Sequence, residues 1–331
     1  MSGNGVQPSI LFPWGDGRRF YSYARYMRNL FGGRVQKLTV DAGLSCPHRA
    51  DRDGPGGCSY CNNAAFNPSY CSPEKGVTQQ LAEGIEFHRN RYRRAEGYLA
   101  YFQAYTNTYA DVDTLRAMFE EALGVAGVRG LVVGTRPDCL PQPVLELLVQ
   151  LSQRTSVTVE LGVESLHDAT LRRVRRGHAA AVSLEAIARL HDAGLPVGVH
   201  LIVGLPGEGE EEVMETLETI GRQPISSVKF HQLQVLKGTL MAQEWAANPA
   251  AFSLLGLERY LALARRMVMH LPATIAVERI CAEAPPRFLL APDWGTLRND
   301  VILARFEREL EEHDAWQGKA LGVVGRSKPA S

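Results

Sequence analysis

Residues 128–163 read VRGLVVGTRPDCLPQPVLELLVQLSQRTSVTVELGV, and this stretch holds one complete strand–helix–strand unit. Its two ends, Val128–Gly134 and Val157–Val163, are short apolar runs rich in valine, which is typical of buried strands. Between them, Pro143–Leu151 places leucine and valine at helical spacing. Two buried strands joined through a helix predict neighbouring parallel strands with a helical crossover.

The same alternation extends along the chain in both directions. Further strands are expected at Val35–Val40, Tyr98–Ala104, Val197–Val203 and Ser227–Val235. Further helices are expected near Val77–Arg93, Val112–Leu123, Leu184–Ala193 and Glu211–Ile220. Six β–α units in series with right-handed crossovers predict an α/β fold, a partial (β/α)6 TIM-like barrel. In such a barrel the chemistry lies at the carboxyl ends of the strands.

The segments on either side of this barrel have different patterns. Arg18–Phe31 shows helical spacing and stops at a glycine pair, which predicts a short N-terminal helix. After the barrel, Leu254–Leu271 and Asn299–Glu312 favour helices and Thr274–Ile280 favours a short strand. The expected divisions are an N-terminal helical segment (residues 1–34), the barrel core (35–240), a small C-terminal extension packing on the barrel (241–317) and a flexible tail (318–331).

The composition excludes several classes of protein. The chain has 331 residues, of which 45% are hydrophobic and 22% charged, as in globular proteins. No apolar run approaches the roughly 20 residues needed to cross a bilayer, and residues 1–20 hold no signal-peptide core. We therefore expect a cytoplasmic protein. In that compartment six cysteines indicate metal binding, catalysis or core packing rather than disulfides.

Charge is balanced over the chain but distributed unevenly. There are 36 basic and 36 acidic residues, yet residues 1–100 carry 13 basic against 8 acidic. Two stretches there interleave arginine with tyrosine: Arg18, Arg19, Tyr21, Arg25, Tyr26 and Arg28, and then Arg89, Arg91, Tyr92, Arg93 and Arg94. Such stretches are typical either of contacts to nucleic-acid phosphates or of solvated helix faces. Zero net charge excludes only a uniformly basic nucleic-acid binder.

Three cysteines follow the first predicted strand at the spacing Cys46-x11-Cys58-x2-Cys61. The x2 pair lets two thiolates converge on one centre, and the glycine-rich loop lets the third fold inward. Three such thiolates are typical of packed core cysteines, of a structural zinc site with Cys71 as the fourth ligand, or of an iron–sulfur cluster with one open iron. The loop composition disfavours plain packing, but the spacing alone does not separate zinc from iron–sulfur.

Four further motifs follow, each near the end of a predicted strand or in the loop after one. They are GTRPD at 134–138, ELGVES at 160–165, RRGH at 175–178 and HLIVGLPGE at 200–208. In this order, with an aromatic residue before the last cysteine of the loop, they resemble the radical S-adenosylmethionine (SAM) enzymes. The 11-residue spacing is similar to that of the YhcC-like proteins, in the branch that includes the Elongator catalytic subunit and oxygen-independent coproporphyrinogen oxidase. The resemblance covers residues 35–239 well and 278–310 more faintly.

This resemblance implies a [4Fe–4S] cluster held by Cys46, Cys58 and Cys61, with SAM bound to the fourth iron. It implies that an electron from an external flavodoxin- or ferredoxin-like donor cleaves SAM to methionine and a 5′-deoxyadenosyl radical, which abstracts a substrate hydrogen. The Elongator relatives act on the wobble uridine of transfer RNA, and YhcC-like proteins are linked to its modification, so transfer RNA is the expected substrate. Two alternatives stay open: a radical SAM reaction on a small molecule, and a zinc-stabilised interaction module.

The resemblance also implies which residues contact SAM. Tyr60 is expected near the adenine, Glu164 at the ribose hydroxyls and Arg176 at the carboxylate. The remaining expected contacts are Thr106, Ser165, His200, Gly204, Leu205 and Pro206. Each residue type has a structural alternative: an aromatic ring packed in a loop, a carboxylate capping a helix, an arginine on a solvated helix end, or a histidine in the core.

Several other residues complete the expectations. Lys229, His231 and Lys237 alternate on the last barrel strand and are expected to face the barrel mouth, where a substrate would bind. The remaining cysteines, Cys71, Cys139 and Cys281, have no partner spacing and are expected to be packed bystanders, with a second cluster as the alternative. The loop 102–108 lacks the glycine pair that relatives often have, and residue 134 is Gly where relatives often have Glu.

Overall fold

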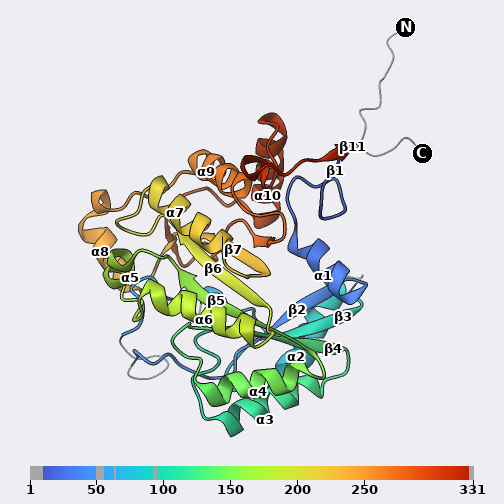
Figure 1. Cartoon of the computed structure of the whole chain (residues 1–331). Coiled ribbons are helices and arrows are strands. Elements are labelled where there is room, and N and C mark those ends of the chain that lie inside the picture. The colour runs from blue at the N-terminus through green and yellow to red at the C-terminus, as the bar shows by residue number, and fades with distance from the viewer. Residues whose placement is uncertain (1–9, 50–55, 63–64, 92–94, 328–331) are drawn as a thin grey trace.

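The chain folds around one sheet of seven parallel strands. The computed structural model describes residues 10–49, 56–62, 65–91 and 95–327. The strand order is β2-β3-β4-β5-β6-β7-β9, and every neighbouring pair runs parallel. Figure 1 shows the strands curving into an open half-barrel with helices along its outer side. The predicted partial barrel is therefore confirmed.

The predicted barrel elements all occur, with small displacements at their ends. The strands are β2 (Val35–Val40), β3 (Gly97–Phe102), β4 (Val128–Thr135), β5 (Ser156–Glu164), β6 (Val197–Val203) and β7 (Ser227–Gln232). The outer helices are α2 (Val77–Arg91), α3 (Val112–Leu123), α4 (Gln142–Ser152), α6 (Ala180–Asp192) and α7 (Glu210–Gly221). The expected strand to residue 235 ends earlier, because β8 (Val235–Leu236) leaves the sheet and pairs with β10 (Leu289–Ala291).

The C-terminal region adds the seventh strand. β9 (Ala276–Arg279) pairs in parallel with β7, so it forms the second edge of the sheet. Around it lie α8 (Leu240–Ala247), α9 (Leu257–Met269), α10 (Asn299–Glu312) and the short helices η2 (Pro249–Ala251) and η3 (Lys319–Leu321). The sequence patterns did not indicate α8 or the short α5 (Asp168–Arg173). Of the expected tail, residues 328–331 lie outside the described residues, whereas β11 (Arg326–Ser327) pairs with β1 (Ile10–Leu11).

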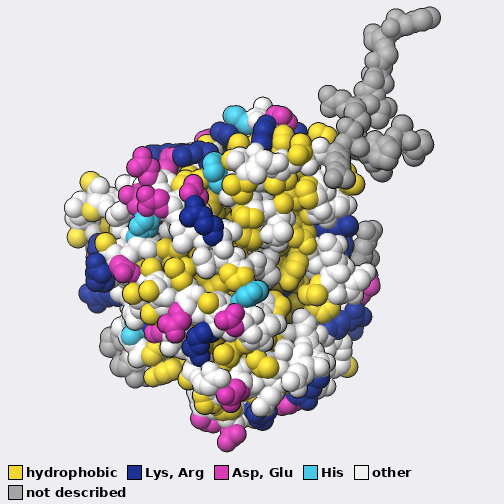
Figure 2. All heavy atoms as spheres, viewed as in Figure 1, with side chains coloured by type: hydrophobic (Ala, Val, Ile, Leu, Met, Phe, Trp, Pro, Cys, Tyr) yellow, Lys and Arg dark blue, Asp and Glu magenta, His cyan; other side chains and the backbone are white. Residues whose placement is uncertain are grey.

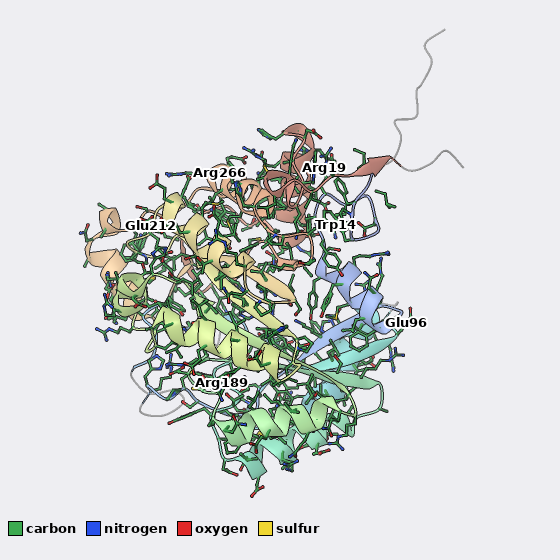
Figure 3. The ribbon with its side chains drawn as sticks, in the orientation of Figure 1. Trp14, Arg19, Glu96, Arg189, Glu212 and Arg266 are labelled. Carbon is green, nitrogen blue, oxygen red and sulfur yellow. The ribbon has the colours of Figure 1, made fainter. Side chains whose placement is uncertain are left out.

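The N-terminal helix α1 (Tyr23–Phe31) is shorter than the helical spacing from Arg18 predicted. It starts where the Ser22 hydroxyl accepts a hydrogen bond from the Arg25 amide at 3.3 Å, and it ends at Gly32 with φ 75°. Before Ser22 the chain instead packs against the C-terminal region: Arg18 pairs with Glu307 and Arg19 with Asp314. Figure 3 labels Arg19 in this region. Two arginines of the first basic stretch are thus neutralised within the chain.

Alternate residues of the central strands face opposite sides of the sheet. On β3, Ala100 and Phe102 join the large core between sheet and outer helices, whereas Leu99 and Tyr101 face inward. The inward side chains pack against α1 through Met27. Because alternate residues of a strand point to the same face, the inward side chains form a surface that needs to be covered. Helix α1 covers this surface at one end of the half-barrel.

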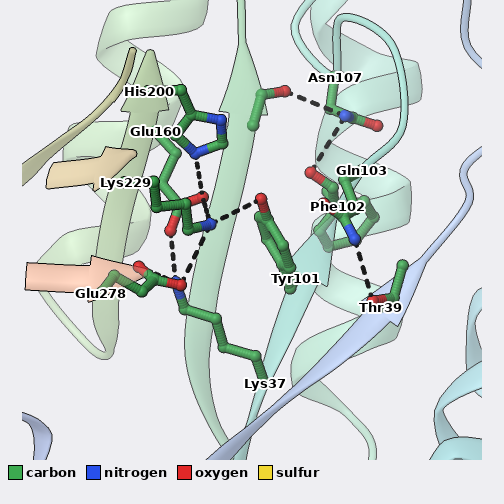
Figure 4. Close-up of polar contacts among 11 residues, drawn as sticks. Lys37, Thr39, Tyr101, Phe102, Gln103, Asn107, Glu160, His200, Lys229 and Glu278 are labelled. Carbon is green, nitrogen blue, oxygen red and sulfur yellow. Dashed lines mark hydrogen bonds and ion pairs between the residues drawn. The ribbon is translucent and has the colours of Figure 1, made fainter. Parts of the chain in front are cut away.

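The middle of the half-barrel holds a buried network of charged side chains (Figure 4). Lys37 on β2 lies 2.8 Å from both carboxylate oxygens of Glu278 on β9 and also contacts Glu160 on β5. Lys229 on β7 donates to Glu160 at 2.5 Å and to the Tyr101 hydroxyl at 3.0 Å. The contact between Lys37 and Glu278 joins the two edge strands, which no backbone hydrogen bonds connect among the described residues.

The opposite charges in this network hold each other ionised. Burial alone would raise the pKa of Glu160, but Lys229 and Lys37 hold it well below its usual range. Burial would likewise lower the pKa of Lys37, but Glu160 and Glu278 raise it well above its usual range. Because the pKa of Glu160 is lower in the folded state, its contribution to stability is present at neutral pH and is lost as the pH falls below the ordinary value of 4.5.

Replacing Lys37 with Met is expected to destabilise the fold by about 3–5 kcal/mol, because it leaves Glu160 and Glu278 with an uncompensated buried charge. Urea unfolding followed by circular dichroism measures this free energy. The matched control is Arg305→Met, whose contact with Glu258 at 3.5 Å is solvent-exposed and is worth about 1 kcal/mol or less. Equal unfolding free energies for the two variants would show that the Lys37 network does not hold the barrel together.

Candidate active site

Three cysteine thiols line one cavity of about 190 Å³ at the carboxyl ends of the strands. Cys46 follows β2, and the Cys58 carbonyl accepts a hydrogen bond from the Cys61 amide at 3.1 Å, so a tight turn joins the last two. The Cys46 thiol lies 3.1 Å from the Thr106 hydroxyl. The structure thus brings together the three cysteines that the sequence predicted as cluster ligands; residues 50–55 of the intervening loop lie outside the described residues.

Burial disfavours the thiolate form of two of these cysteines, Cys46 and Cys61. Burial raises the pKa of Cys46, and burial together with the neighbouring Cys58 raises the pKa of Cys61 to about 12. A bound metal centre reverses this effect, because thiolate is the ligand form and a nearby cation favours it. Among residues 10–327 as described, no three His, Cys, Asp or Glu side chains already stand in the arrangement of a bound metal ion.

His48 reaches the same thiols from the cysteine loop. Arg136 makes two hydrogen bonds to Asp138, at 2.8 and 2.6 Å, and also donates to Nδ1 of His48. Burial and the positive charge of Arg136 lower the pKa of His48 to about 4, so the ring is neutral. Because Nδ1 accepts, the ring proton lies on Nε2, which is 3.7 Å from the Cys58 sulfur.

Arg176 is a second buried cation of the cavity beside Arg136, with 6% of its surface exposed. Its Nη1 lies 3.5 Å from the Cys58 sulfur, and its Nη2 donates to the Gly162 carbonyl and lies 3.4 Å from Glu164. Its Nε is buried and has no hydrogen-bond partner among the described residues. A buried donor without a partner is costly, so this atom fits an acceptor on a ligand such as a carboxylate.

Glu164 stands at the end of β5 in a backbone conformation that few residues other than glycine adopt, with φ 69°. The register with β6 shifts between Gly162 and Glu164, which turns this side chain into the cavity. Burial raises its pKa, and Arg176 opposes that shift. Strained backbone of this kind is concentrated at functional sites.

A second and larger cavity of about 860 Å³ lies beside the first. The residues that line both cavities are Tyr60, Cys61, Tyr101, Gln103, Ala104, Glu164 and His200. His200 donates from Nε2 to the ionised Glu160 carboxylate at 2.9 Å and stacks on His231, with ring centres 5.7 Å apart. Lys229 and His231 line the larger cavity as the sequence predicted, whereas Lys237 does not. A large polar cavity therefore shares a wall with the thiols.

Among the other predicted SAM contacts, Tyr60 lines the two cavities and residues 204–206 do not. Tyr60 lines both cavities and packs against the apolar cluster of Leu205 and Leu233. Gly204 takes φ 88°, a conformation that suits glycine, and turns the chain after β6. Leu205 is buried in that cluster behind Tyr60, and Gly204, Leu205 and Pro206 do not line either cavity.

Two predicted contacts serve other side chains in this structure. Thr106 is fully buried and lies in the thiol cavity, but its hydroxyl contacts Cys46. The Ser165 hydroxyl donates to Glu208 and accepts from the His167 amide at 3.0 Å, and Ser165 lines neither cavity. The Ser165 side chain therefore holds the start of the α5 region, and the expectation of a direct SAM contact does not fit its position.

The three remaining cysteines lie outside the thiol cavity. Cys71 donates to the Thr39 carbonyl at 3.0 Å, which leaves it unavailable as a fourth zinc ligand beside Cys46. Cys281 donates to Asn299 at 3.3 Å, and Cys139 lies 3.8 Å from Asp138. Burial raises the pKa of each of these thiols to about 12. They have the environment of packed thiols.

The sequence reasoning missed the ionised groups that support the site. Glu160 belongs to a motif that was recognised, yet its role in holding Lys37, Lys229 and His200 was not expected. The sequence held a signal for this role. Positions 160, 162 and 164 are two residues apart on β5, so Glu160, Gly162 and Glu164 lie on one face of the strand. Gly134, where relatives often have Glu, is also explained, because a Cβ there would stand 3.0 Å from the Phe102 carbonyl.

Comparison with known families gives two matches that together span most of the chain. The profile of the radical SAM superfamily matches residues 52–220, and that of the radical SAM C-terminal domain matches residues 225–312. Protein YhcC of Escherichia coli is 41% identical over 303 residues, which covers 89% of this chain and 95% of that protein. Within the described residues no helix has both the length and the apolar character needed to cross a membrane.

Two more distant relatives carry the same core. The tRNA uridine(34) acetyltransferase of Methanocaldococcus infernus is 30% identical over 118 residues, which covers 35% of this chain and 22% of the acetyltransferase. The solved structure of the archaeal Elp3 of that organism, with an N-terminal deletion, has a TM-score of 0.68 at 18% identity and covers 86% of this chain. This chain spans 64% of that structure, so the likeness shows a shared fold.

The three thiols outside the cavity are expected to resist alkylation in the folded protein. At pH 8 a pKa of about 12 leaves about a thousandfold less thiolate than the ordinary value of 9.0 does at Cys71, Cys139 and Cys281. Peptide mass spectrometry after iodoacetamide treatment, in buffer and in urea, measures the two rates at each site. A site that reacts equally fast in both conditions would not be packed as described.

Proposed function

The chain belongs to the radical SAM superfamily, and we propose that it modifies the wobble uridine of transfer RNA, bound in the 860 Å³ cavity. Enzymes of this superfamily use a [4Fe–4S] cluster and SAM. When bound, the two cofactors supply a 5′-deoxyadenosyl radical that takes a hydrogen atom from the substrate. The observation that carries the proposal is the wall that the thiol cavity and the larger polar cavity share.

Cys46, Cys58 and Cys61 would hold the cluster. Their fit rests on the donor set itself: three thiols line one cavity, and burial raises the pKa of Cys46 and Cys61, an effect that a bound cation would reverse. The Thr106 hydroxyl contacts the Cys46 sulfur, and N–H groups of His48 and Arg176 point at the Cys58 sulfur. Hydrogen bonds to the sulfurs are among the factors that set the reduction potential of such clusters.

Arg176 would bind the carboxylate of SAM, because its Nε is buried and lacks a partner among the described residues. Glu164 and His200 stand where the two cavities meet and would accept from or donate to the ribose hydroxyls. Tyr60, packed in front of Leu205, would cover the adenine. These residues would hold SAM where the thiol cavity and the larger cavity meet.

The larger cavity has the chemistry of a nucleobase site. Nε2 of His231 and Oε1 of Gln234 are buried without hydrogen-bond partners among the described residues. Burial and the charge of Arg279 hold the pKa of His231 well below its usual range, so its ring is neutral and offers one donor and one acceptor. The edge of uracil presents a matching set of carbonyl acceptors and an imide N–H donor. The relative named tRNA uridine(34) acetyltransferase supports the same choice of substrate.

Radical SAM enzymes need an external electron donor, and we expect a flavodoxin- or ferredoxin-like protein in this role. We also infer that the protein works in the cytoplasm, because all six of its cysteines are free thiols, as is usual in a reducing compartment. Because the chain belongs to the radical SAM superfamily, we interpret the cysteine loop as a cluster loop and not as part of a zinc-stabilised interaction module. A small-molecule substrate is the second candidate, since a cavity of 860 Å³ also lies in the range of small-molecule sites.

Replacing Cys58 with Ala is expected to abolish both the iron–sulfur absorbance after anaerobic reconstitution and the formation of 5′-deoxyadenosine, because one of three protein ligands is lost. The matched control is Cys71→Ala, which removes a thiol outside the cavity and should leave both readouts unchanged. Circular dichroism shows that each variant is folded. Retained 5′-deoxyadenosine formation by the Cys58 variant, or its loss in the Cys71 variant, would overturn the ligand assignment.

Deleting the gene is expected to remove or change one wobble-position nucleoside in bulk transfer RNA, and the chain with Cys58→Ala should fail to restore it. Nucleoside mass spectrometry of transfer RNA from the deletion strain, with and without each complementing copy, measures this change. An unaltered nucleoside profile, accompanied by a new imbalance in a small-molecule pool, would favour the small-molecule substrate instead.

A further inference from the structure

A third cavity, which we call the lateral groove, opens on the side of the half-barrel between its two edge strands. It has a volume of about 560 Å³ and is lined by residues of α1, α2, β2, β3 and β9. Figure 1 shows α1 beside β2 at this open side. Because Ser22 at the start of α1 bridges to Val277 of β9, α1 and β9 form one wall of the groove, and β2 with α2 forms the other.

The lateral groove runs into the proposed substrate cavity. The residues that line both are Pro68, Tyr101, Gln103, Lys229 and Arg279. Arg279 also lines a smaller cavity of about 300 Å³ below the edge of the sheet, so it stands at the junction of all three. A chain-like substrate with one unit in the 860 Å³ cavity would therefore leave through the lateral groove.

The groove carries an excess of positive charge. Five of the described residues that line it are Lys or Arg, and one, Glu278, is acidic. The charges of Lys37 and Lys229 are already balanced by Glu160 and Glu278. By contrast, Arg28 and Arg279 are exposed and make no ion pair with other described residues. Over much of the face shown in Figure 2, basic and acidic side chains are interspersed.

Aromatic rings line the wall opposite Arg28 and Arg279. Tyr70 and Phe87 stand with ring centres 5.5 Å apart, and Phe87 meets His88 edge-on at 5.1 Å. Phe87 keeps 39% of its surface exposed although it is one of the larger apolar side chains of the chain. An exposed aromatic ring facing arginines is the combination that binds single-stranded nucleic acid, since bases stack on the ring and phosphates pair with the cations.

We propose that the lateral groove binds the RNA strand next to the target nucleotide, with Arg279 on the phosphate at the mouth of the substrate cavity, Arg28 on the following phosphate and Phe87 stacked on a base. This inference rests on the proposed function, because it requires an RNA substrate in the neighbouring cavity. The combination of anion sites and an exposed aromatic ring favours RNA over an acidic protein, which would match the charges but offer no base to stack on Phe87.

Charge reversal tests the groove directly. The reconstituted full chain is titrated with a wobble-position anticodon stem-loop RNA and with oligouridine over a range of salt concentrations. Arg279→Glu and Arg28→Glu are each expected to weaken binding and to reduce the slope of log K against log salt by about one, which is a fourfold smaller loss of affinity between about 50 and 200 mM salt. The matched control, Arg222→Glu, reverses an exposed arginine outside the groove and should bind like the wild type.

A second pair of variants tests stacking. Phe87→Ala is expected to weaken oligouridine binding about fivefold or more with little change in the salt slope, because one base–ring contact is lost. Its control is Tyr109→Ala, an exposed ring that does not line the groove. Thermal unfolding shows that all variants remain folded.

The outcomes separate this inference from the proposed function. Binding of RNA by the wild type with no change in Arg279→Glu, Arg28→Glu and Phe87→Ala would overturn the groove and leave the RNA substrate standing. No RNA binding by the wild type would remove both. Variants that lose binding to flavodoxin while they bind RNA normally would assign the groove to an acidic protein partner instead.

Discussion

The contact between Lys37 and Glu278 is the constraint on which the rest of the structure depends. Seven strands do not close into a barrel through hydrogen bonds, so β2 and β9 remain as separate edges. The two side chains meet at 2.8 Å across that opening and fix how far apart the edges stand. Since buried ions need close partners, the curvature of the sheet and the network inside it determine each other.

The same network connects stability to the active site through one strand. On β5, Glu160 binds the lysines and His200, while Glu164 at the strand end lines the cavities. Between them, Gly162 leaves room for Arg176: a Cβ there would lie 2.5 Å from its Nη2. Along one face of β5 the chain thus carries the buried charge of Glu160, the space at Gly162 that Arg176 occupies, and the Glu164 carboxylate that lines the cavities.

Local patterns in the sequence were sufficient for the barrel but not for its interior. Valine-rich runs and helical spacing located β2, β6 and α3 with their ends, because strand and helix periods are properties of neighbouring residues. The order of motifs predicted Cys46, Cys58 and Cys61 as cluster ligands, and the structure places the three thiols around one cavity. Local patterns could not predict the pairing of Lys37 with Glu278, because these residues are 241 positions apart in the sequence. The contact of Ser165 with Glu208 could not be predicted from local patterns for a related reason, because Glu208 comes from the next β–α unit.

The proposed RNA groove lies at the open edge that the ion pair spans, where a protein of zero net charge would bind a polyanion. Inside the half-barrel the positive charges of the lysines and the negative charges of the carboxylates balance. The interior is therefore polar but carries little net charge. Arg28 and Arg279 at the rim make no ion pair with other described residues, so positive charge is concentrated at the opening, beside the cavity that adjoins the thiols. A radical reaction needs its target atom held firmly and kept from water. The proposed entrance, which would hold the flanking backbone next to the substrate cavity, would meet both requirements without a chain-wide basic surface.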